Sequence, residues 1–255
     1  MEISETLLLQ WLSPIFWPFI RVLAVFSVAP IFASRAFPTR VRVSLALLVA
    51  WSSAGVIPEQ VLVSLTGPDA IRVVMHEILV GLSIGFSVRI VFAAAEFAGE
   101  IIGLQMGLNF AGFFNPSSNM QASAMAVFMG HMTALLFVVL NGHLMVLLAV
   151  VQSYKFIPLN SSMLDLIQNW RLHEMGALIF SSAFWMALPV MVLLLLVNIA
   201  LGFMSRVAPQ MNIYAVGFPV TLTAGLAGLL ILFPFMDRAF FTLFELALEN
   251  FGRSI

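Results

Sequence analysis

Long runs of the chain contain no charged residue, and they limit the possible folds more than any other feature. No Asp, Glu, Lys or Arg occurs in Ile101 to Tyr154, in Met175 to Ser205 or in Val207 to Met236. Across the chain 62% of residues are hydrophobic and 9% are charged, and the mean hydropathy is +1.06. A soluble globule needs a largely polar surface, with about 25% charged residues. The sequence therefore excludes a soluble enzyme and predicts an all-α, polytopic membrane-type protein.

Several kinds of chemistry are missing from the composition. The chain has no cysteine, which excludes disulfides and thiolate catalysis, and no phosphate-binding motif surrounds its single lysine, Lys155. The net charge of −1 provides no basic patch for nucleic acid. His76 and Glu77 are neighbours, so on a helix we expect them to point apart, and no nucleophile–base set is found elsewhere. We therefore expect a non-enzymatic chain with no cofactor and no metal.

Hydrophobic runs and turn residues divide the sequence into about six long helices. We expect these helices near residues 7–33, 41–57, 71–106, 122–151, 174–204 and 214–235, followed by an amphipathic tail from Asp237 to Ile255. A helix needs about 20 apolar residues to cross a bilayer, so the second is short for a span. The third is unusually polar and must be partly buried against protein or reach water. No stretch suits a linker between soluble domains, and residues 1–255 are predicted to form one domain.

Three ionisable residues of the third helix fall on one face. Glu96 and Glu100 follow Arg89 by 7 and 11 positions. At 100° per residue, both acids lie within about 20° of the arginine around the helix. This spacing predicts a buried ion network. A structural ion pair is the simpler interpretation, and a proton or ion pathway is the alternative.

Small residues recur at the spacing that lets helices approach closely. They form three ladders: Ala95, Gly99, Gly103, Gly107 and Ala111; Gly217, Thr221 and Gly225; and Gly81 with Gly85. Such ladders favour close helix–helix packing. The packing can lie within the chain or between subunits, and the sequence leaves both open.

The expected loop from Gly107 to Asn119 is rich in aromatic residues. It carries Phe110, Phe113 and Phe114, with Gly107 and Gly112 as flexible points and Asn115-Pro116 as a turn. Phenylalanines on a mobile loop suit a pore plug, because a hydrophobic constriction blocks ions by dewetting. Packing in a core is the alternative. Five methionines flank the loop, either as pore-flanking adaptable contacts or as ordinary helix filler: Met106, Met120, Met125, Met129 and Met132.

Three stretches, in a fixed order, carry a family pattern. They are Pro30-Ile31-Phe32 with Pro38-x-Arg40-Val41-Arg42; Glu96-x-x-Gly99-x-x-x-Gly103-x-Gln105-Met106-Gly107-Leu108 leading to Asn115-Pro116; and Asn198 to Asn212 followed by Val216-Gly217-Phe218-Pro219. In the third, a helix ends at a lone arginine before an Ala-Pro-Gln-x-Asn turn. Together with the length and the order of the helices, these stretches resemble the FliR family of flagellar type III export-gate proteins and its injectisome relatives.

The resemblance implies a subunit of an export gate in the bacterial inner membrane, within the flagellar basal body. Members of this family assemble with FliP-family and FliQ-family subunits and contact the FlhB family. Together these subunits form the channel for unfolded flagellar proteins. The resemblance also implies a pore-closing loop at 107–119 and helices that lie partly outside the lipid. The turn formed by Arg206, Pro209, Gln210 and Asn212 is then expected to contact a neighbouring gate protein, or else only to join two helices.

A second function class fits the composition. A small-molecule secondary transporter or channel would use helices broken at Pro189 and Pro219, with the Arg89, Glu96 and Glu100 face as its coupling site. This alternative predicts inverted repeats, and none is found in the sequence. It also predicts a chain that functions alone or as a homo-oligomer, whereas the export gate requires different partner chains.

Overall fold

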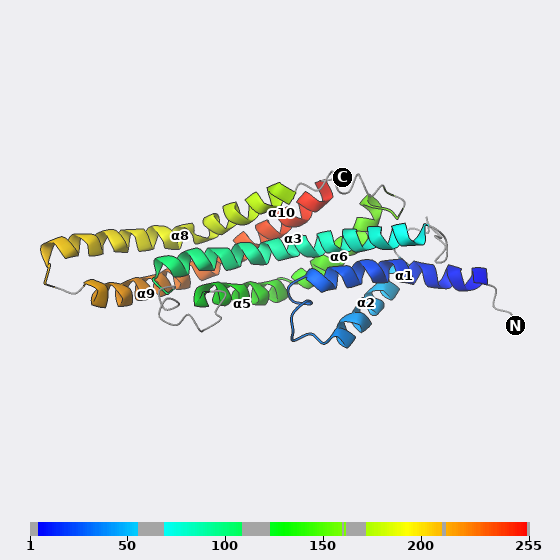
Figure 1. Cartoon of the computed structure of the whole chain (residues 1–255), viewed down its shortest axis with the longest axis horizontal. Coiled ribbons are helices and arrows are strands. Elements are labelled where there is room, and N and C mark those ends of the chain that lie inside the picture. The colour runs from blue at the N-terminus through cyan, green and yellow to red at the C-terminus, as the bar shows by residue number, and fades with distance from the viewer. Residues whose placement is uncertain are drawn as a thin grey trace. The chain divides into compact units, whose positions relative to one another are not determined.

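The computed structural model describes residues 5–55, 69–108, 123–159, 161, 172–210 and 213–253. Every regular element in these ranges is a helix (Figure 1). In chain order the elements are α1 (Glu5–Val28), α2 (Thr39–Ser53), α3 (Ala70–Gln105), α5 (Ala124–Val139), α6 (Gly142–Phe156), α8 (Leu172–Val207), α9 (Ile213–Leu232), the short 3-10 helix η1 (Phe233–Phe235) and α10 (Met236–Arg253). The predicted all-α class is confirmed, and the expected amphipathic tail corresponds to α10.

The prediction of one helix over 122–151 is wrong, because this segment forms two helices. Helices α5 and α6 meet at a bend of 68°. Asn141, between them, has a φ of 57°, in the left-handed region that interrupts a helix. Asparagine tolerates this conformation better than most residues, and Gly142 follows it. By contrast, α8 and α9 continue through Pro189 and Pro219 without a break.

Three helical segments are long and apolar enough to cross a membrane. They are Ala70–Gln105, Met175–Val207 and Ala215–Ala247, and the bent pair α5–α6 makes a fourth if it counts as one span. Helix α1 contributes only the shorter apolar segment Leu12–Val28. Helix α2 has 15 residues, below the length of a span. Among the described residues, the chain is thus a polytopic helical membrane protein with fewer spans than the six expected helices.

The chain packs as two compact units that share α3. Unit 1 comprises Met1–Ile90, Val138–Leu172 and Phe244–Ile255, and unit 2 comprises Val91–Phe137 and His173–Leu243. Because α3 runs through both units as one helix, the expected single domain stays a prediction.

In unit 1, α1 packs against both α2 and the first half of α3. Helix α2 turns small buried residues toward α1, spaced four and three positions apart: Ala46, Ala50 and Ser53. A separate apolar cluster joins Trp17 of α1 to Val73 of α3 and to Tyr154 and Leu159. These contacts bring α1, α3 and α6 together around a polar centre.

In unit 2, the second half of α3 lies directly against α5. A Cβ atom built on Gly99 would come within 2.6 Å of the Met125 carbonyl oxygen and 2.9 Å of the Ala126 Cα. Glycine is therefore required at this crossing. The small-residue ladders were expected to pack within the chain or between subunits. Packing within the chain is confirmed for the described glycines Gly81, Gly85 and Gly99. Phe97 of α3 also makes edge contacts with Phe180 and Phe184 of α8.

Candidate functional site

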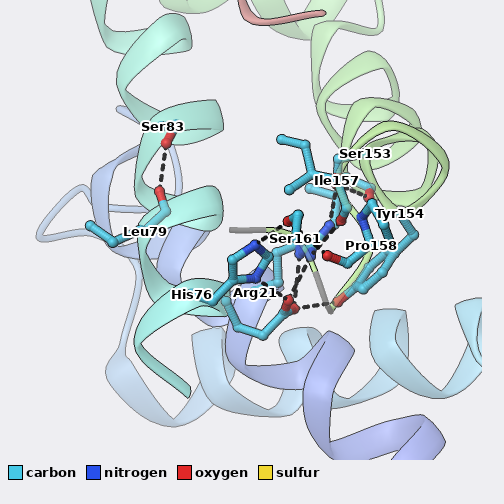
Figure 2. Close-up of polar contacts among 11 residues, drawn as sticks. Arg21, His76, Leu79, Ser83, Ser153, Tyr154, Ile157, Pro158 and Ser161 are labelled. Atoms are coloured by element: carbon cyan, nitrogen blue, oxygen red, sulfur yellow. Dashed lines mark hydrogen bonds and ion pairs between the residues drawn. The ribbon is translucent and has the colours of Figure 1, made fainter. Parts of the chain in front are cut away.

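A fully buried ion pair connects α1 to α3 in unit 1 (Figure 2). Arg21 Nε donates to Glu77 Oε2 at 2.9 Å, and Nη2 donates to Oε1 at 2.5 Å. The guanidinium and the carboxylate thus meet through two parallel bonds, the strongest geometry for this pair. Arg21 Nη1 donates to Ser153 Oγ at 2.8 Å, and Nη2 also reaches the Ile157 carbonyl at 3.3 Å. The arginine therefore holds the end of α6 as well as α3.

Tyr154 of α6 completes the polar centre. Its hydroxyl donates to Glu77 Oε2 at 2.7 Å, and its ring lies against Arg21, with 3.6 Å between Cζ and the ring centroid. The ring thus adds a cation–π contact, and the hydroxyl adds a second hydrogen bond to Glu77 Oε2. Side chains from three helices meet at this carboxylate. Arg21 lies 56 positions before Glu77 in the sequence, and Tyr154 lies 77 positions after it.

Two glycines allow α3 to approach α1 closely enough for this pairing. Gly81 lies one turn after Glu77, and a Cβ atom there would clash with the Arg21 carbonyl oxygen and lie 2.6 Å from Ala24 Cβ. A Cβ atom on Gly85 would lie 2.9 Å from the Val25 carbonyl oxygen. Because backbone atoms cannot move aside as a flexible side chain can, the sequence needs glycine at both positions to seat α3 on α1.

His76 extends the centre toward Ser161. Its Nε2 lies 2.7 Å from Ser161 Oγ, and its Nδ1 lies 3.3 Å from Glu77 Oε1. The expectation that the His76 and Glu77 side chains point apart is therefore wrong. Adjacent helical side chains can still meet when both are drawn into one buried centre, and their exposed fractions are 2% and 0%.

The resulting Ser–His–Glu arrangement contains contacts that compete with activation of a nucleophile. Ser161 Oγ lies within reach of two acceptors, His76 Nε2 at 2.7 Å and the Pro158 carbonyl at 2.9 Å. Donation to the carbonyl leaves the serine unactivated, because a nucleophilic serine donates to the histidine. Glu77 is occupied by Arg21 and Tyr154, so it cannot serve mainly to orient the imidazole. The geometry instead satisfies each polar group with a neighbour, as a structural centre requires. Within the described ranges, no group of three or more His, Asp or Glu side chains could hold a metal ion.

The predicted ion network on α3 takes a different form. Arg89 is exposed, so the expectation that it is buried with the two acids is wrong. Glu96 is half-buried and lies against Gly130 of α5, and Glu100 Oε2 accepts a bond of 3.2 Å from the Ser123 backbone N–H at the start of α5. A carboxylate at a helix N-terminus is stabilised by the N–H groups there. Glu100 thus acts as a structural anchor for α5.

The methionines next to the aromatic loop lie mainly in the packed interior. Met106, Met125 and Met129 are buried, and Met132 is half-buried. The burial of three of them favours the alternative of core packing, and the pore-flanking role stays a prediction. Gly107 is described and has a φ of 83°. The other predicted members of this site lie outside the described residues: Phe110, Gly112, Phe113, Phe114, Asn115, Pro116 and Met120.

The predicted partner-contact turn lies at the end of α8. Arg206, Pro209 and Gln210 are exposed, and Asn212 lies outside the described residues. Two large apolar side chains beside the arginine, Phe203 and Val207, are exposed as well. A charged residue set among exposed apolar side chains is typical of a surface that another molecule covers.

Helix α8 carries a long uncovered apolar face. Only 22% of its most hydrophobic window is buried, compared with 67% for the corresponding window of α3. The large exposed apolar side chains of this helix are Phe180, Phe184, Trp185, Leu188, Val192, Leu195, Leu196, Ile199, Phe203, Met204 and Val207. Such a face is not stable against water, so lipid or other apolar helices must cover it.

A comparison with known protein families shows to which family the chain belongs. The model of the family described as "Bacterial export proteins, family 1" matches residues 12–247. The chain belongs to this family. Among its relatives, "Flagellar biosynthetic protein FliR" of Escherichia coli (strain K12) is 37% identical over 250 residues, covering 96% of this chain and 95% of the relative. The protein of the same name from Pectobacterium carotovorum subsp. carotovorum is 38% identical over 245 residues, with 94% and 93% covered. That from Bacillus subtilis (strain 168) is 26% identical over 242 residues, with 91% and 90% covered.

This membership in bacterial export protein family 1 confirms the resemblance to FliR-family flagellar export proteins. The matched range contains the whole Arg21–Glu77–Tyr154 centre, which the sequence reasoning did not find. A signal for it was present, because Arg21 is the one charged residue between Thr6 and Ser34. A lone charge in an apolar helix needs a buried counter-charge, and Glu77 was available in the third helix.

Proposed function

We propose that this chain is a non-enzymatic subunit of the flagellar type III protein export gate. It forms, with FliP-family and FliQ-family subunits, the channel through which unfolded flagellar proteins cross the bacterial inner membrane, and it contacts an FlhB-family protein. The observation that carries the proposal is the match of residues 12–247 to a bacterial export family, with flagellar relatives similar over nearly the whole chain.

The uncovered apolar face of α8 supports co-assembly. The stretch from Met175 to Ser205 contains no charged residue, so the face can pack against partner helices as well as lipid. Partner helices would cover the parts of this face that extend beyond the hydrocarbon core, which is about 30 Å thick. At 1.5 Å per residue, the 33 described residues of this candidate span would extend about 50 Å.

The transporter alternative is less well supported. That class of protein uses helices broken near the bilayer midplane. Helices α8 and α9 are continuous through Pro189 and Pro219. Helices α5 and α6 do form a bent pair, but its break lies at Asn141 and not next to the acids of α3 that the alternative would use.

The loop from Gly107 to Asn119 serves as the pore plug in this proposal. Its phenylalanines would close the channel to ions when no exported chain is present. Deleting Phe110 to Phe114 should leave the gate assembled but make the membrane leaky, measured as ion or small-solute uptake by cells that contain the assembled deletion variant. A gate of normal composition that stays impermeable after this deletion would refute the plug.

The turn after α8 contacts a neighbouring gate subunit in this proposal. Pro209 and Gln210 are exposed, which leaves the turn available. A photo-crosslinking residue at Gln210 or Asn212 should therefore capture a partner chain. The same residue at Arg72, an exposed position at the start of α3, serves as a comparison. Crosslinks confined to the chain itself would show that the turn only joins α8 to α9.

The proposed function is tested by deleting the gene in the source bacterium. Secretion of flagellar filament protein into the medium should stop and should return when the gene is restored. An unchanged secretion of filament protein, combined with a loss of uptake or efflux of a small molecule, would contradict the export-gate proposal and favour a transporter.

A further inference from the structure

The end of α3 is fixed by its own backbone. Gly107 adopts a φ of 83°, and its N–H donates to the Leu104 carbonyl at 3.2 Å. The N–H of Leu108 donates to the Gly103 carbonyl at 3.0 Å. A left-handed glycine with this pair of bonds is a strong helix stop. The expectation that Gly107 is a flexible point stays a prediction.

The residue before this stop is held by α9. Met106 is fully buried, and its side chain occupies the space above Gly225. A Cβ atom on Gly225 would lie 2.5, 2.7 and 2.8 Å from Met106 Cγ, Sδ and Cε. An alanine at position 225 would thus displace three successive side-chain atoms of Met106, and not only its flexible end. Gly225 is therefore the base of a hole shaped for this methionine.

Thr221, one turn before Gly225, contacts the backbone of Met106. Its Oγ1 lies 3.3 Å from the Met106 carbonyl oxygen, and it shares its proton with the carbonyls of Gly217 and Phe218 at 3.1 Å each. Met106 is thus held through its side chain by Gly225 and reached at its carbonyl by Thr221. Both contacts lie within unit 2.

We propose that Thr221 and Gly225 form a seat on α9 that holds Met106 and so sets the point and the direction in which the chain leaves α3 at Leu108. These are positioning residues for the loop, and this role rests on the proposed pore function.

A spin label at position 108 tests the seat without relying on export. The natural chain has no cysteine, so Leu108→Cys gives one labelling site in this chain, and the gate is assembled with cysteine-free variants of its partners. In the otherwise unchanged chain, the label should give an immobilised electron paramagnetic resonance spectrum. Gly225→Ala, which pushes Met106 out of its hole, should remove the immobilised component, and Met106→Ala should do the same by removing the seated side chain.

Gly55→Ala is the matched control, because a Cβ atom on that glycine meets nothing within 4 Å. It should leave the spectrum unchanged. Met106→Ala only removes atoms, so it carries the test if Gly225→Ala does not assemble. A label that stays immobilised in the seat variants, or is already mobile without them, would overturn the proposal. Ion leakage measured on the same variants separates the two ideas: a mobile label without leakage supports the seat but refutes the plug.

Discussion

Replacing Glu77 by glutamine removes the negative charge that faces Arg21 in the interior of unit 1. Both side chains are 0% exposed, so the guanidinium cannot regain water without opening the contact of α1 with α3. Removing one partner of a buried ion pair typically costs about 3–5 kcal/mol, mainly because the other charge stays buried and unbalanced. We expect Glu77→Gln to fall in this range.

The double variant Arg21→Met with Glu77→Gln provides the decisive comparison. It removes both charges while keeping side chains of similar length, and replacing a whole buried pair by neutral groups is often nearly neutral. We therefore expect it to recover much of the stability lost in Glu77→Gln. The two sites are in contact, so their effects should not add.

The matched control is the surface pair formed by Arg72 and Asp69. Its N–O distance is 3.7 Å, and its side chains are 48% and 73% exposed. Exposed pairs contribute about 0–1 kcal/mol, so Asp69→Asn should have little effect. The assay is thermal unfolding of the purified gate complex followed by tryptophan fluorescence, in which Trp17 lies in the adjoining core. This reasoning would be refuted if the Glu77→Gln complex had the same melting temperature as the unchanged complex, or if the double variant were as unstable as the single one.

Three further predictions concern other described positions. Ser161→Ala should leave flagellar secretion unchanged in a motility and secretion assay, since the serine has a structural role; a selective loss of secretion would revive a catalytic one. Gly81→Ala should prevent recovery of the assembled gate in detergent because its Cβ meets backbone, whereas Gly55→Ala should be tolerated; equal recovery of the two would contradict this packing. Replacing Glu96 and Glu100 by glutamine should lower the amount of assembled gate more than the secretion per gate, and the reverse order would indicate a proton path.

The course of the helices was largely predictable because charge-free runs depend only on composition along the chain. Helices α1, α2, α3, α8 and α9 all overlap the ranges expected for them. The break at Asn141 was not predicted, although Asn141-Gly142 is a turn-type pair, because the apolar runs on both sides suggested one continuous helix. Hydrophobic periodicity does not reveal a single residue in the left-handed backbone conformation.

The polar centre of unit 1 could not be derived in the same way. Its bonds join Arg21 to residues 56 and 132 positions later, so they depend on how three helices pack. Spacing along one helix drew attention to Arg89 instead, which is exposed. The methionines illustrate the same limit, because flexible apolar side chains suit a core and a pore equally well until the packing around them is known.

The most direct test of the export-gate account is purification of the chain with and without its FliP-family and FliQ-family partners from the same bacterium. When co-expressed, the chain should elute from size-exclusion chromatography in one complex with both partners, because the apolar face of α8 needs cover. When expressed alone, it should aggregate or be degraded. A long-lived, monodisperse monomer in mild detergent that binds neither partner would contradict the account.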